Sequence, residues 1–384
     1  MTSDLPVVPA HLRPRDGRFG CGPSRIRERQ IEALSSPLLM GTSHRQAPVR
    51  GVVSGIRRGL AELFSLPEGW TVVLGNGGTT AFWAVATASL VRRRAAHAVF
   101  GEFGQKFADE TCAAPFLSPS VQVSAPAGAV AVLSGDEGAA SADGPAPDVF
   151  AYPHHETSTG TLSPVYRPSA PAGAPGDALT LVDATSIAAG ADVDVSVTDA
   201  YYFAPQKCLA SDGGLWIALL SPAARERARE LHGAPDRWVP QFLDLQLAIQ
   251  NSEKDQTLNT PAIATLVMLR EQIRWMLDLG GLPATAARSR ACSDLLYRWA
   301  ERSEVATPFV AEPRWRSPVV VTLDFAPQVD AARLARALRA SGIVDVEPYR
   351  KLRRNQLRIA TFPATDIADV EALLASIDWL LPRL

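Results

Sequence analysis

Short apolar segments and amphipathic segments alternate along this chain, and this alternation constrains its fold more than any other feature. Strands are typically separated by helices when they form a parallel sheet with helical crossovers. The sequence therefore predicts an α/β fold in which helices flank a mainly parallel sheet. The strand-like segments are 71–74, 98–100, 121–124, 149–152, 179–182, 199–203 and 215–220, and helical patterns occupy 79–91 and 104–112.

The pattern changes in the last third of the chain. A helical spacing runs from 261 to 279, and Gly280-Gly281 is a plausible stop for it. We therefore predict a large domain over residues 17–270 and a small α+β domain over residues 271–384, on which residues 1–16 would pack. The small domain would contain helices at 285–302, 330–341 and 367–381 and strands at 319–325 and 357–360.

Composition excludes several classes of protein. The 384 residues are 47% hydrophobic and 20% charged, which is enough to bury a large core. A formal net charge of -2 predicts no nucleic-acid partner, and no run reaches the ~18 apolar residues of a membrane span. The first 18 residues lack the apolar core of a signal peptide, so we expect a cytoplasmic protein. The scattered Cys21, Cys112, Cys208 and Cys292 have no spacing typical of a zinc site or a disulfide framework.

An acid and a lysine each follow a strand-like segment. Asp183 directly follows the apolar run 179–182, and Lys207 follows the aromatic run 199–203. Ligands of open α/β sheets bind at the carboxyl ends of the strands. Enzymes that use pyridoxal phosphate need a lysine amine for a Schiff base and a carboxylate that keeps the pyridinium nitrogen protonated. The alternative is an exposed lysine and a loop aspartate, but Lys207 lies between segments that we expect to be buried.

A phosphate needs its own anchor. The run Gly75-Asn76-Gly77-Gly78-Thr79-Thr80 follows a strand and opens a helix, so backbone N–H groups, hydroxyls and the positive end of the helix dipole converge there. Packing alone can require such a turn, so the motif is informative only together with Asp183 and Lys207.

A polar run, His154-His155-Glu156-Thr157-Ser158-Thr159-Gly160, follows the strand at 149–152. A hydroxyl here could hydrogen-bond the phenolic oxygen of the cofactor, and we assign that contact to Thr157. Metal binding is the alternative, but adjacent histidines diverge and make a poor chelating pair. We therefore predict no metal.

Arginines are the expected substrate ligands, because their planar forks bind carboxylates and phosphates with two hydrogen bonds. The candidates are Arg45, Arg350 and Arg358. A basic run usually lies on a solvent-exposed face, and we interpret Arg353 and Arg354 in this way. Arg358 differs because it lies in an alternating segment and can point into a cleft.

These motifs together resemble the phosphoserine aminotransferases, in the branch typical of actinobacteria. That group belongs to the class-V aminotransferases and to the fold type I pyridoxal phosphate enzymes. The resemblance implies a seven-stranded sheet, a smaller C-terminal domain, and a homodimer with active sites shared between the subunits. The matching segments are 19–24, 43–48, 75–78, 154–160, 201–207, 259–261 and 347–358.

The resemblance also implies a role for each residue. Lys207 would form the Schiff base and carry the proton to and from the substrate α carbon, and Asp183 would pair with the pyridinium nitrogen. Phe103 would stack on the ring, and Arg358 would bind the substrate α-carboxylate. The cofactor phosphate would be held by Gly78, Thr79 and Gln206, with Asn259 and Thr260 of the partner subunit. The phosphate of phosphoserine, or the distal carboxylate of glutamate, would be bound by His44, Arg45 and Arg350.

The chain departs from the enterobacterial form of the family at several of these places. An arginine is replaced by Thr79, a tryptophan by Phe103, an asparagine by His155 and a histidine by Tyr349. These changes remove positive charge from the phosphate pocket. The basic side chains that could replace it are those of Lys351, Arg353 and Arg354.

The implied reaction is the reversible transfer of an amino group from L-glutamate to 3-phosphohydroxypyruvate, giving O-phospho-L-serine and 2-oxoglutarate. The resemblance also suggests 4-phosphohydroxy-L-threonine of pyridoxine biosynthesis as a substrate. The alternatives are an aminotransferase of the alanine–glyoxylate type, a lyase, and a pyridoxal-phosphate-binding module without turnover. A substrate without phosphate would leave His44, Arg45 and Arg350 without a shared anionic partner, and a module without turnover would be expected to lack Lys207 or Asp183.

Overall fold

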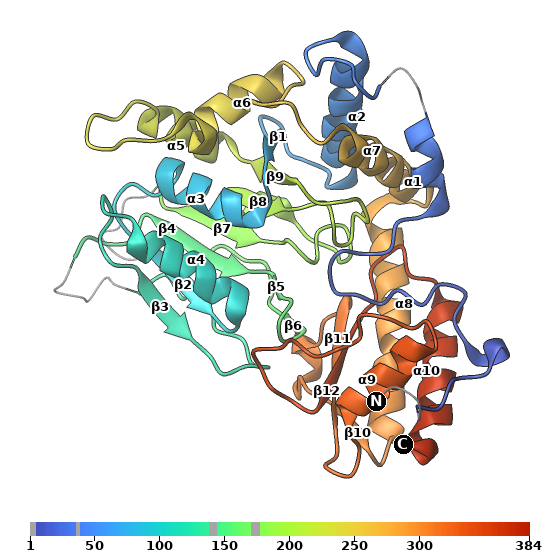
Figure 1. Cartoon of the computed structure of the whole chain (residues 1–384). Coiled ribbons are helices and arrows are strands. Elements are labelled where there is room, and N and C mark those ends of the chain that lie inside the picture. Colours follow the sequence, from blue (N-terminus) through green and yellow to red (C-terminus); the bar gives the residue numbers. More distant parts are fainter. Residues whose placement is uncertain (1–4, 36–38, 138–143, 170–176) are drawn as a thin grey trace.

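The computed structural model describes residues 5–35, 39–137, 144–169 and 177–384 (Figure 1). At its centre lies a seven-stranded sheet with the strand order β1-β9-β8-β7-β4-β2-β3. Strand β9 is antiparallel to both neighbours and the other adjacent pairs are parallel, which confirms the predicted mainly parallel sheet. The strands are Thr71–Asn76 (β1), Ala95–Val99 (β2), Val121–Ser124 (β3), Val149–Pro153 (β4), Leu179–Asp183 (β7), Ala200–Phe203 (β8) and Leu215–Leu220 (β9).

Both faces of this sheet are covered, which explains why every residue of its central strands β4, β7, β8 and β9 is buried. All 6 residues of β9 are buried. Leu215, Ile217 and Leu219 join one hydrophobic cluster, while Trp216, Ala218 and Leu220 join another, because successive side chains of a strand point to opposite faces. Continuous apolar runs are typical of strands that are buried on both sides.

Helices form the two outer layers. Side chains of α2 (Ala47–Leu63) and α7 (Ile263–Asp278) belong to the cluster on one face. The opposite face is covered by α3 (Thr79–Ser89), α4 (Glu102–Ala113), α5 (Pro222–Leu231) and α6 (Leu245–Glu253). The short helix α1 (Glu28–Glu32) lies beside α7, and β5 (His155–Glu156) pairs with β6 (Thr161–Leu162).

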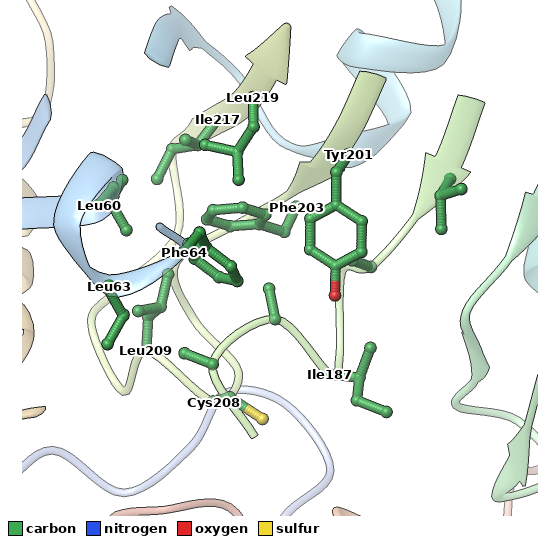
Figure 2. Packing of buried hydrophobic residues seen from close by; sticks show 14 of the residues in the cluster. Leu60, Leu63, Phe64, Ile187, Tyr201, Phe203, Cys208, Leu209, Ile217 and Leu219 are labelled. Atoms are coloured by element: carbon green, nitrogen blue, oxygen red, sulfur yellow. The ribbon is translucent and has the colours of Figure 1, made fainter. Parts of the chain in front are cut away.

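Aromatic packing next to β8 fixes the start of the loop that carries Lys207. The ring of Phe64 lies with its centroid 5.8 Å from that of Tyr201 and 5.7 Å from that of Phe203. Figure 2 shows Cys208 and Leu209 in the same cluster, and both are buried. Because these two residues directly follow Lys207, the core holds the turn in place.

A second, smaller unit is formed by the C-terminal part of the chain. Its antiparallel sheet has the order β10-β11-β12, with β10 (Ala306–Pro308), β11 (Val320–Phe325) and β12 (Gln356–Ala360). Helices α8 (Gly281–Arg302), α9 (Ala331–Ala340) and α10 (Ile367–Leu380) pack with this sheet around a separate cluster, in the lower part of Figure 1.

The N-terminal segment runs along this smaller unit. The backbone N–H of Val8 donates to Ser341 Oγ at 2.9 Å, and Ser376 Oγ donates to the carbonyl of Leu12 at 3.0 Å. Of residues 1–16, the structure describes residues 5–16. The division into domains at residue 270 stays a prediction.

Most elements lie where the sequence placed them, but four helices were missed. Helices α1, α2, α5 and α6 were not predicted, and α8 begins at Gly281 and not at 285. Gly280 has a φ of 114°, a left-handed conformation that glycine adopts without strain, so α7 ends and α8 begins within a few residues. Of the segment 125–147, residues 138–143 lie outside the described residues.

Within the described ranges, no helix is long and apolar enough to cross a membrane, and no group of three or more His, Cys, Asp and Glu side chains could hold a metal ion. All four cysteines are free, and Cys112 is exposed while Cys21, Cys208 and Cys292 are buried.

Candidate active site

The carboxyl ends of five strands meet at one edge of the large sheet. Strands β2, β4, β7 and β8 are parallel, and β1 has the same direction because both β1 and β8 are antiparallel to β9. Asp183 is the last residue of β7, and Lys207 lies in the turn after β8. The glycine-rich turn follows β1 at the same edge. The sheet therefore brings the three predicted motifs together.

Asp183 is a buried carboxylate held on both oxygens. Trp83 Nε1 donates to Oδ2 at 3.0 Å, and the backbone N–H and the hydroxyl of Thr185 donate to Oδ1 at 2.9 and 2.5 Å. Burial raises the pKa of Asp183, against the opposing effect of these hydrogen bonds and of the nearby Lys207. A cation placed next to this carboxyl would restore its ionised form.

Lys207 projects its amine toward the N-terminal segment, where Nζ donates to the carbonyl oxygen of Cys21 at 2.6 Å. Loss of water around this amine, with the charge of Arg358 nearby, lowers its pKa to about 8. A lysine with such a pKa has a substantial neutral fraction near neutral pH and can act as a nucleophile or a base.

Gly22 makes room for this amine. A Cβ at position 22 would lie 2.4 Å from Lys207 Nζ, and Gly22 has a φ of 129°, which side chains rarely allow. A larger residue there would displace the lysine.

The helix N-terminus after β1 is open. Gly78 is the N-cap of α3, and a Cβ built on it would have no neighbour within 4 Å. Thr79 Oγ1 lies 2.8 Å from Thr185 Oγ1, so the turn is joined to the loop that holds Asp183. The side-chain oxygen of Gln206 is buried without a hydrogen-bond partner among the described residues. These groups can hold an anion at the helix N-terminus.

A hydrogen-bond relay crosses the loop after β4. Thr157 Oγ1 donates to Ser186 Oγ at 2.7 Å, and Ser186 Oγ lies 2.7 Å from His155 Nδ1. Arg358, on β12 of the small unit, donates from Nη1 to the carbonyl oxygen of Thr157 at 3.1 Å. Arg358 therefore faces the site, as its position in the alternating segment predicted.

Glu156 holds the start of α4, where Phe103 lies. Its Oε2 accepts the backbone N–H groups of Phe103 and Gly104 at 3.0 and 3.1 Å, and its Oε1 accepts the hydroxyl of Ser158 at 2.7 Å. A Cβ at Gly101 would lie 2.1 Å from Glu156 Cγ, so only glycine fits there. The carboxylate positions the aromatic ring that we expect to stack on a cofactor.

A loop of the small unit closes over that ring. The centroid of Tyr349 lies 6.1 Å from that of Phe103, and the guanidinium carbon of Arg358 lies 5.4 Å from the Tyr349 ring centroid. Lys351 forms an ion pair with Glu102 at the N-terminus of α4. Arg350 is exposed, whereas Arg354 pairs with Asp324, which leaves Arg354 poorly placed to bind substrate.

The remaining predicted residues form a separate surface group. His44 Nδ1 lies 3.1 Å from Thr260 Oγ1, and Asn76 Nδ2 donates to the carbonyl oxygen of Thr260 at 3.3 Å. Arg45, Asn259 and Thr260 are exposed, while His44 is buried. We call His44, Arg45, Asn259 and Thr260 the outer group. Among the described residues, the outer group makes no hydrogen bond to Lys207 or Asp183, and its link to the sheet edge is the contact of Thr260 with Asn76.

Sequence reasoning missed several supporting residues. The Cys21 carbonyl, Trp83, Thr185, Ser186 and Glu156 hold the predicted side chains in place. Thr185 and Ser186 lie two and three residues after Asp183 in the sequence, so their closeness to Asp183 could have identified them as supporting residues. Trp83 gave no such signal, because it approaches Asp183 only when α3 packs on the sheet.

Another hollow lies on the far side of the His154 loop. It has a volume of about 560 Å³ and is lined by Arg290, Arg298 and Arg316 as well as by Asp294 and Glu301. Charges of both signs alternate there, and Lys207 is not among the lining residues, so we do not place the active site in this hollow.

Comparison with known proteins identifies the class first. The model of the family described as aminotransferase class-V matches residues 33–344. The chain belongs to the class-V aminotransferase family, as the resemblance of its sequence motifs had led us to expect.

Individual relatives show which members of this family the chain resembles. The chain is 54% identical to a phosphoserine aminotransferase of a Nocardioides species, over all of both chains. A solved phosphoserine aminotransferase of Cytophaga hutchinsonii has a TM-score of 0.82 and 21% identity, covering 94% of this chain and 98% of that one. A solved alanine–glyoxylate aminotransferase of a Nostoc species has a TM-score of 0.80 and 20% sequence identity, and the match covers 98% of each chain. Within its family the chain groups with the phosphoserine aminotransferases of actinobacteria.

Proposed function

We propose that this protein transfers the amino group of L-glutamate to 3-phosphohydroxypyruvate, giving O-phospho-L-serine and 2-oxoglutarate in serine biosynthesis. The observation that carries the proposal is the amine of Lys207, with a pKa near 8, at the same sheet edge as the buried carboxylate of Asp183. Full-length identity to phosphoserine aminotransferases supports the choice of substrate.

The residues at this edge fit pyridoxal phosphate, the cofactor that the family implies. Asp183 is a buried carboxyl that a protonated ring nitrogen would keep ionised. The open N-terminus of α3 suits the phosphate, and the Gln206 amide can turn its N–H₂ toward it, because the two ends of an amide are assigned only from their partners. When bound, pyridoxal phosphate draws electrons from the substrate α carbon.

The side chains of this chain would then divide the work. Lys207 takes the proton from the substrate α carbon and returns it, which its lowered pKa allows near neutral pH. Asp183 holds the ring, Thr157 contacts the phenolic oxygen, and Phe103 stacks on the ring. Tyr349, against Phe103 and Arg358, closes the site and limits the access of water.

Substrates would be bound at both ends. Arg358 would bind the α-carboxylate that all amino-group donors share. Arg350, with His44 and Arg45, would bind either the phosphate of phosphoserine or the distal carboxylate of glutamate. Both are anions at similar reach, so one basic pocket can serve both half-reactions.

A homodimer would complete this pocket. Arg45, Asn259 and Thr260 of the outer group are exposed in the single chain, and the buried Nε2 of His44 has no hydrogen-bond partner within the described part of the chain. Large apolar side chains are exposed close by in sequence, at Ile31 and Met40. We therefore place the outer group across a subunit interface, where it would reach the phosphate sites of the partner.

The fold alone does not select the substrate, because an alanine–glyoxylate aminotransferase shares it closely. Arginines at the mouth of the site favour a substrate with a second anionic group. For the same reason we extend the proposal to 4-phosphohydroxy-L-threonine of pyridoxine biosynthesis. The cytoplasm stays the predicted location.

The direct test is a single-turnover absorbance experiment on the purified holoenzyme. Phosphoserine and glutamate should each convert the cofactor to its amino form, and alanine should not. If alanine alone converts the cofactor, the protein is still an aminotransferase, but phosphoserine is not its substrate. A protein that shows no cofactor band after loading with pyridoxal phosphate would contradict the proposal at Lys207.

A further inference from the structure

We infer that His155 is a substrate-binding residue whose Nε2–H donates to the α-carboxylate beside Arg358. The inference rests on the proposed function, since it assigns a second donor to the same carboxylate. His155 replaces the asparagine of the enterobacterial form, and none of the roles carried over from the family uses it.

The first observation is an unpaired donor inside the site. His155 is 3% exposed, and its Nε2 has no hydrogen-bond partner among the residues that the structure describes. Buried polar atoms nearly always have a partner, so each exception calls for an explanation. A ligand that is absent from the single chain is such an explanation.

The second observation fixes which nitrogen carries the proton. Thr157 Oγ1 donates to Ser186 Oγ, so the Ser186 hydroxyl is free to donate to its other neighbour, His155 Nδ1. Nδ1 then accepts, and in a neutral imidazole Nε2 must carry the proton. Burial, together with the positive charges of Lys207 and Arg358, lowers the pKa of His155 well below its ordinary value, so the ring stays neutral.

The third observation is a second unpaired donor in the neighbourhood. Arg358 Nε is also buried without a partner in the described residues, although Nη1 is bonded to the Thr157 carbonyl. Arg358, from the small unit, hydrogen-bonds the Thr157 carbonyl, and His155, from the large unit, is linked to Thr157 through Ser186. Two N–H donors without acceptors fit a ligand with two acceptor oxygens, as a carboxylate has.

The cofactor is the less suitable acceptor. In the proposed function the phenolic oxygen already has a contact in Thr157, whose Oγ1 donates to Ser186 and keeps lone pairs that can accept the phenolic O–H. A neutral donor adds a hydrogen bond to the carboxylate without a further positive charge beside Lys207. His155 thereby strengthens carboxylate binding without lowering the pKa of the lysine any further.

Two substitutions of His155 test the role of the Nε2–H donor separately from the role of the imidazole ring's shape. The amide nitrogen of glutamine can occupy the place of histidine Nε2, whereas that of asparagine corresponds to Nδ1. His155→Gln therefore keeps the proposed donor, and His155→Asn removes it. The probe is maleate, a dicarboxylate without an amino group, titrated calorimetrically into each holoenzyme.

We expect His155→Asn to weaken maleate binding on the order of tenfold and His155→Gln by less than about threefold. The absorbance and the cofactor content of the ligand-free holoenzymes should match the parent protein, and circular dichroism should show the same fold. Ser186→Ala should give an intermediate loss, because Nδ1 then loses the donor that fixes the tautomer.

Three results would overturn the inference. Equal affinity in all variants would show that Nε2 is not used, and equal losses in both His155 variants would indicate a purely structural role. If the His155 variants have a changed cofactor spectrum before maleate is added, His155 Nε2 donates its hydrogen bond to the cofactor and not to the substrate carboxylate. If the parent protein binds maleate in the expected pattern but does not react with phosphoserine, the proposed substrate fails while the carboxylate contact stands.

Discussion

The sheet edge around Lys207 and the outer group around Arg45 are both needed for the proposed reaction, but they are built in opposite ways. At the sheet edge, the side chains are buried or half-buried and are held by hydrogen bonds to several elements of one chain. In the outer group, Arg45, Asn259 and Thr260 are exposed, and Arg45 makes one long contact, at 3.4 Å, with Gln256. We therefore propose that the groups acting on the cofactor are organised within one chain, whereas recognition of the second anionic group is shared between two chains.

This difference has a physical reason. A proton-transfer group must be held close to one geometry, and packing in a core supplies that constraint. A pocket that accepts both a phosphate and a carboxylate must adapt, and long arginine side chains on loops can do so. Substitutions at the sheet edge should accordingly act on turnover, and those at the mouth of the site on substrate affinity.

The largest effect is expected for Lys207→Ala. Removal of the amine should lower kcat by on the order of 10⁴-fold, the upper range for a positioned proton-transfer group. Steady-state assays with phosphoserine measure this loss. Lys254→Ala is the matched control, because Lys254 is exposed and only its backbone carbonyl accepts a hydrogen bond, from Arg50. A Lys207→Ala protein that keeps more than a tenth of the activity would contradict the assignment.

Arg350→Ala should have the next largest effect. The loss of one charged contact to the substrate phosphate should lower kcat/KM for phosphoserine by about 10- to 100-fold. Arg354→Ala provides the comparison, because Arg354 is engaged with Asp324 and covers the ring of Phe309. Similar losses in both variants would mean that the loop is merely perturbed, and unchanged half-reactions in Arg350→Ala would remove Arg350 from the site.

The lowered pKa of Lys207 predicts a pH dependence of cofactor loading. Only the neutral amine reacts with pyridoxal phosphate, so the loading rate should rise with pH up to about 8 and then level off. Stopped-flow absorbance on the apoprotein measures the midpoint. A midpoint close to the ordinary lysine value of 10.5 would show that the amine is not desolvated.

The same shift has a consequence for stability. Between about pH 8 and 10.5, the folded apoprotein binds fewer protons at Lys207 than the unfolded chain does. The contribution of this lysine to the free energy of unfolding therefore rises with pH across that window. Lys207→Met should abolish that part of the dependence.

The smallest effect is expected for Lys351→Ala. The pair with Glu102 joins the loop of the small unit to α4, but Lys351 is an exposed side chain, and exposed pairs contribute little. We expect KM for both substrates to rise by less than about fivefold and kcat to stay unchanged. Arg353→Ala, at an exposed neighbour in the same loop, is the control. A large fall in kcat would show that the loop acts on the chemistry itself.

The sheet edge was the more predictable of the two regions. Asp183 and Lys207 could be placed because buried strands read as apolar runs, and parallel strands bring their carboxyl ends to the same edge. Trp83 could not be placed, because its contact with Asp183 arises only from the packing of α3 on the sheet. The same limit applies to the Cys21 carbonyl, which is brought to Lys207 by an N-terminal segment without regular structure of its own.

Helix α2 shows a different limit. Its buried face consists mainly of valine, isoleucine and leucine, but the helix also contains Gly51, Gly55 and Gly59, of which Gly59 is buried. Gly59 is required by packing, because a Cβ there would lie 2.6 Å from Ile273 Cγ2 on α7. A pattern that weakens helix propensity can thus be explained only once the neighbouring helix is known. In the outer group, Arg45 was proposed from the chemistry of its side chain, whereas His44, Asn259 and Thr260 were predicted from the resemblance alone, since no local pattern links His44 to Thr260.

The most direct test of a site shared between chains uses mixed dimers. Lys207→Ala and Arg45→Ala chains, each inactive or weak alone, are unfolded together, refolded and assayed with phosphoserine. If Arg45 serves the partner's site, each mixed dimer has one intact site, and activity should return to about a quarter of that of the parent protein. If Arg45 serves its own chain, both sites of the mixed dimer stay defective, and no recovery above the separate variants would contradict the account.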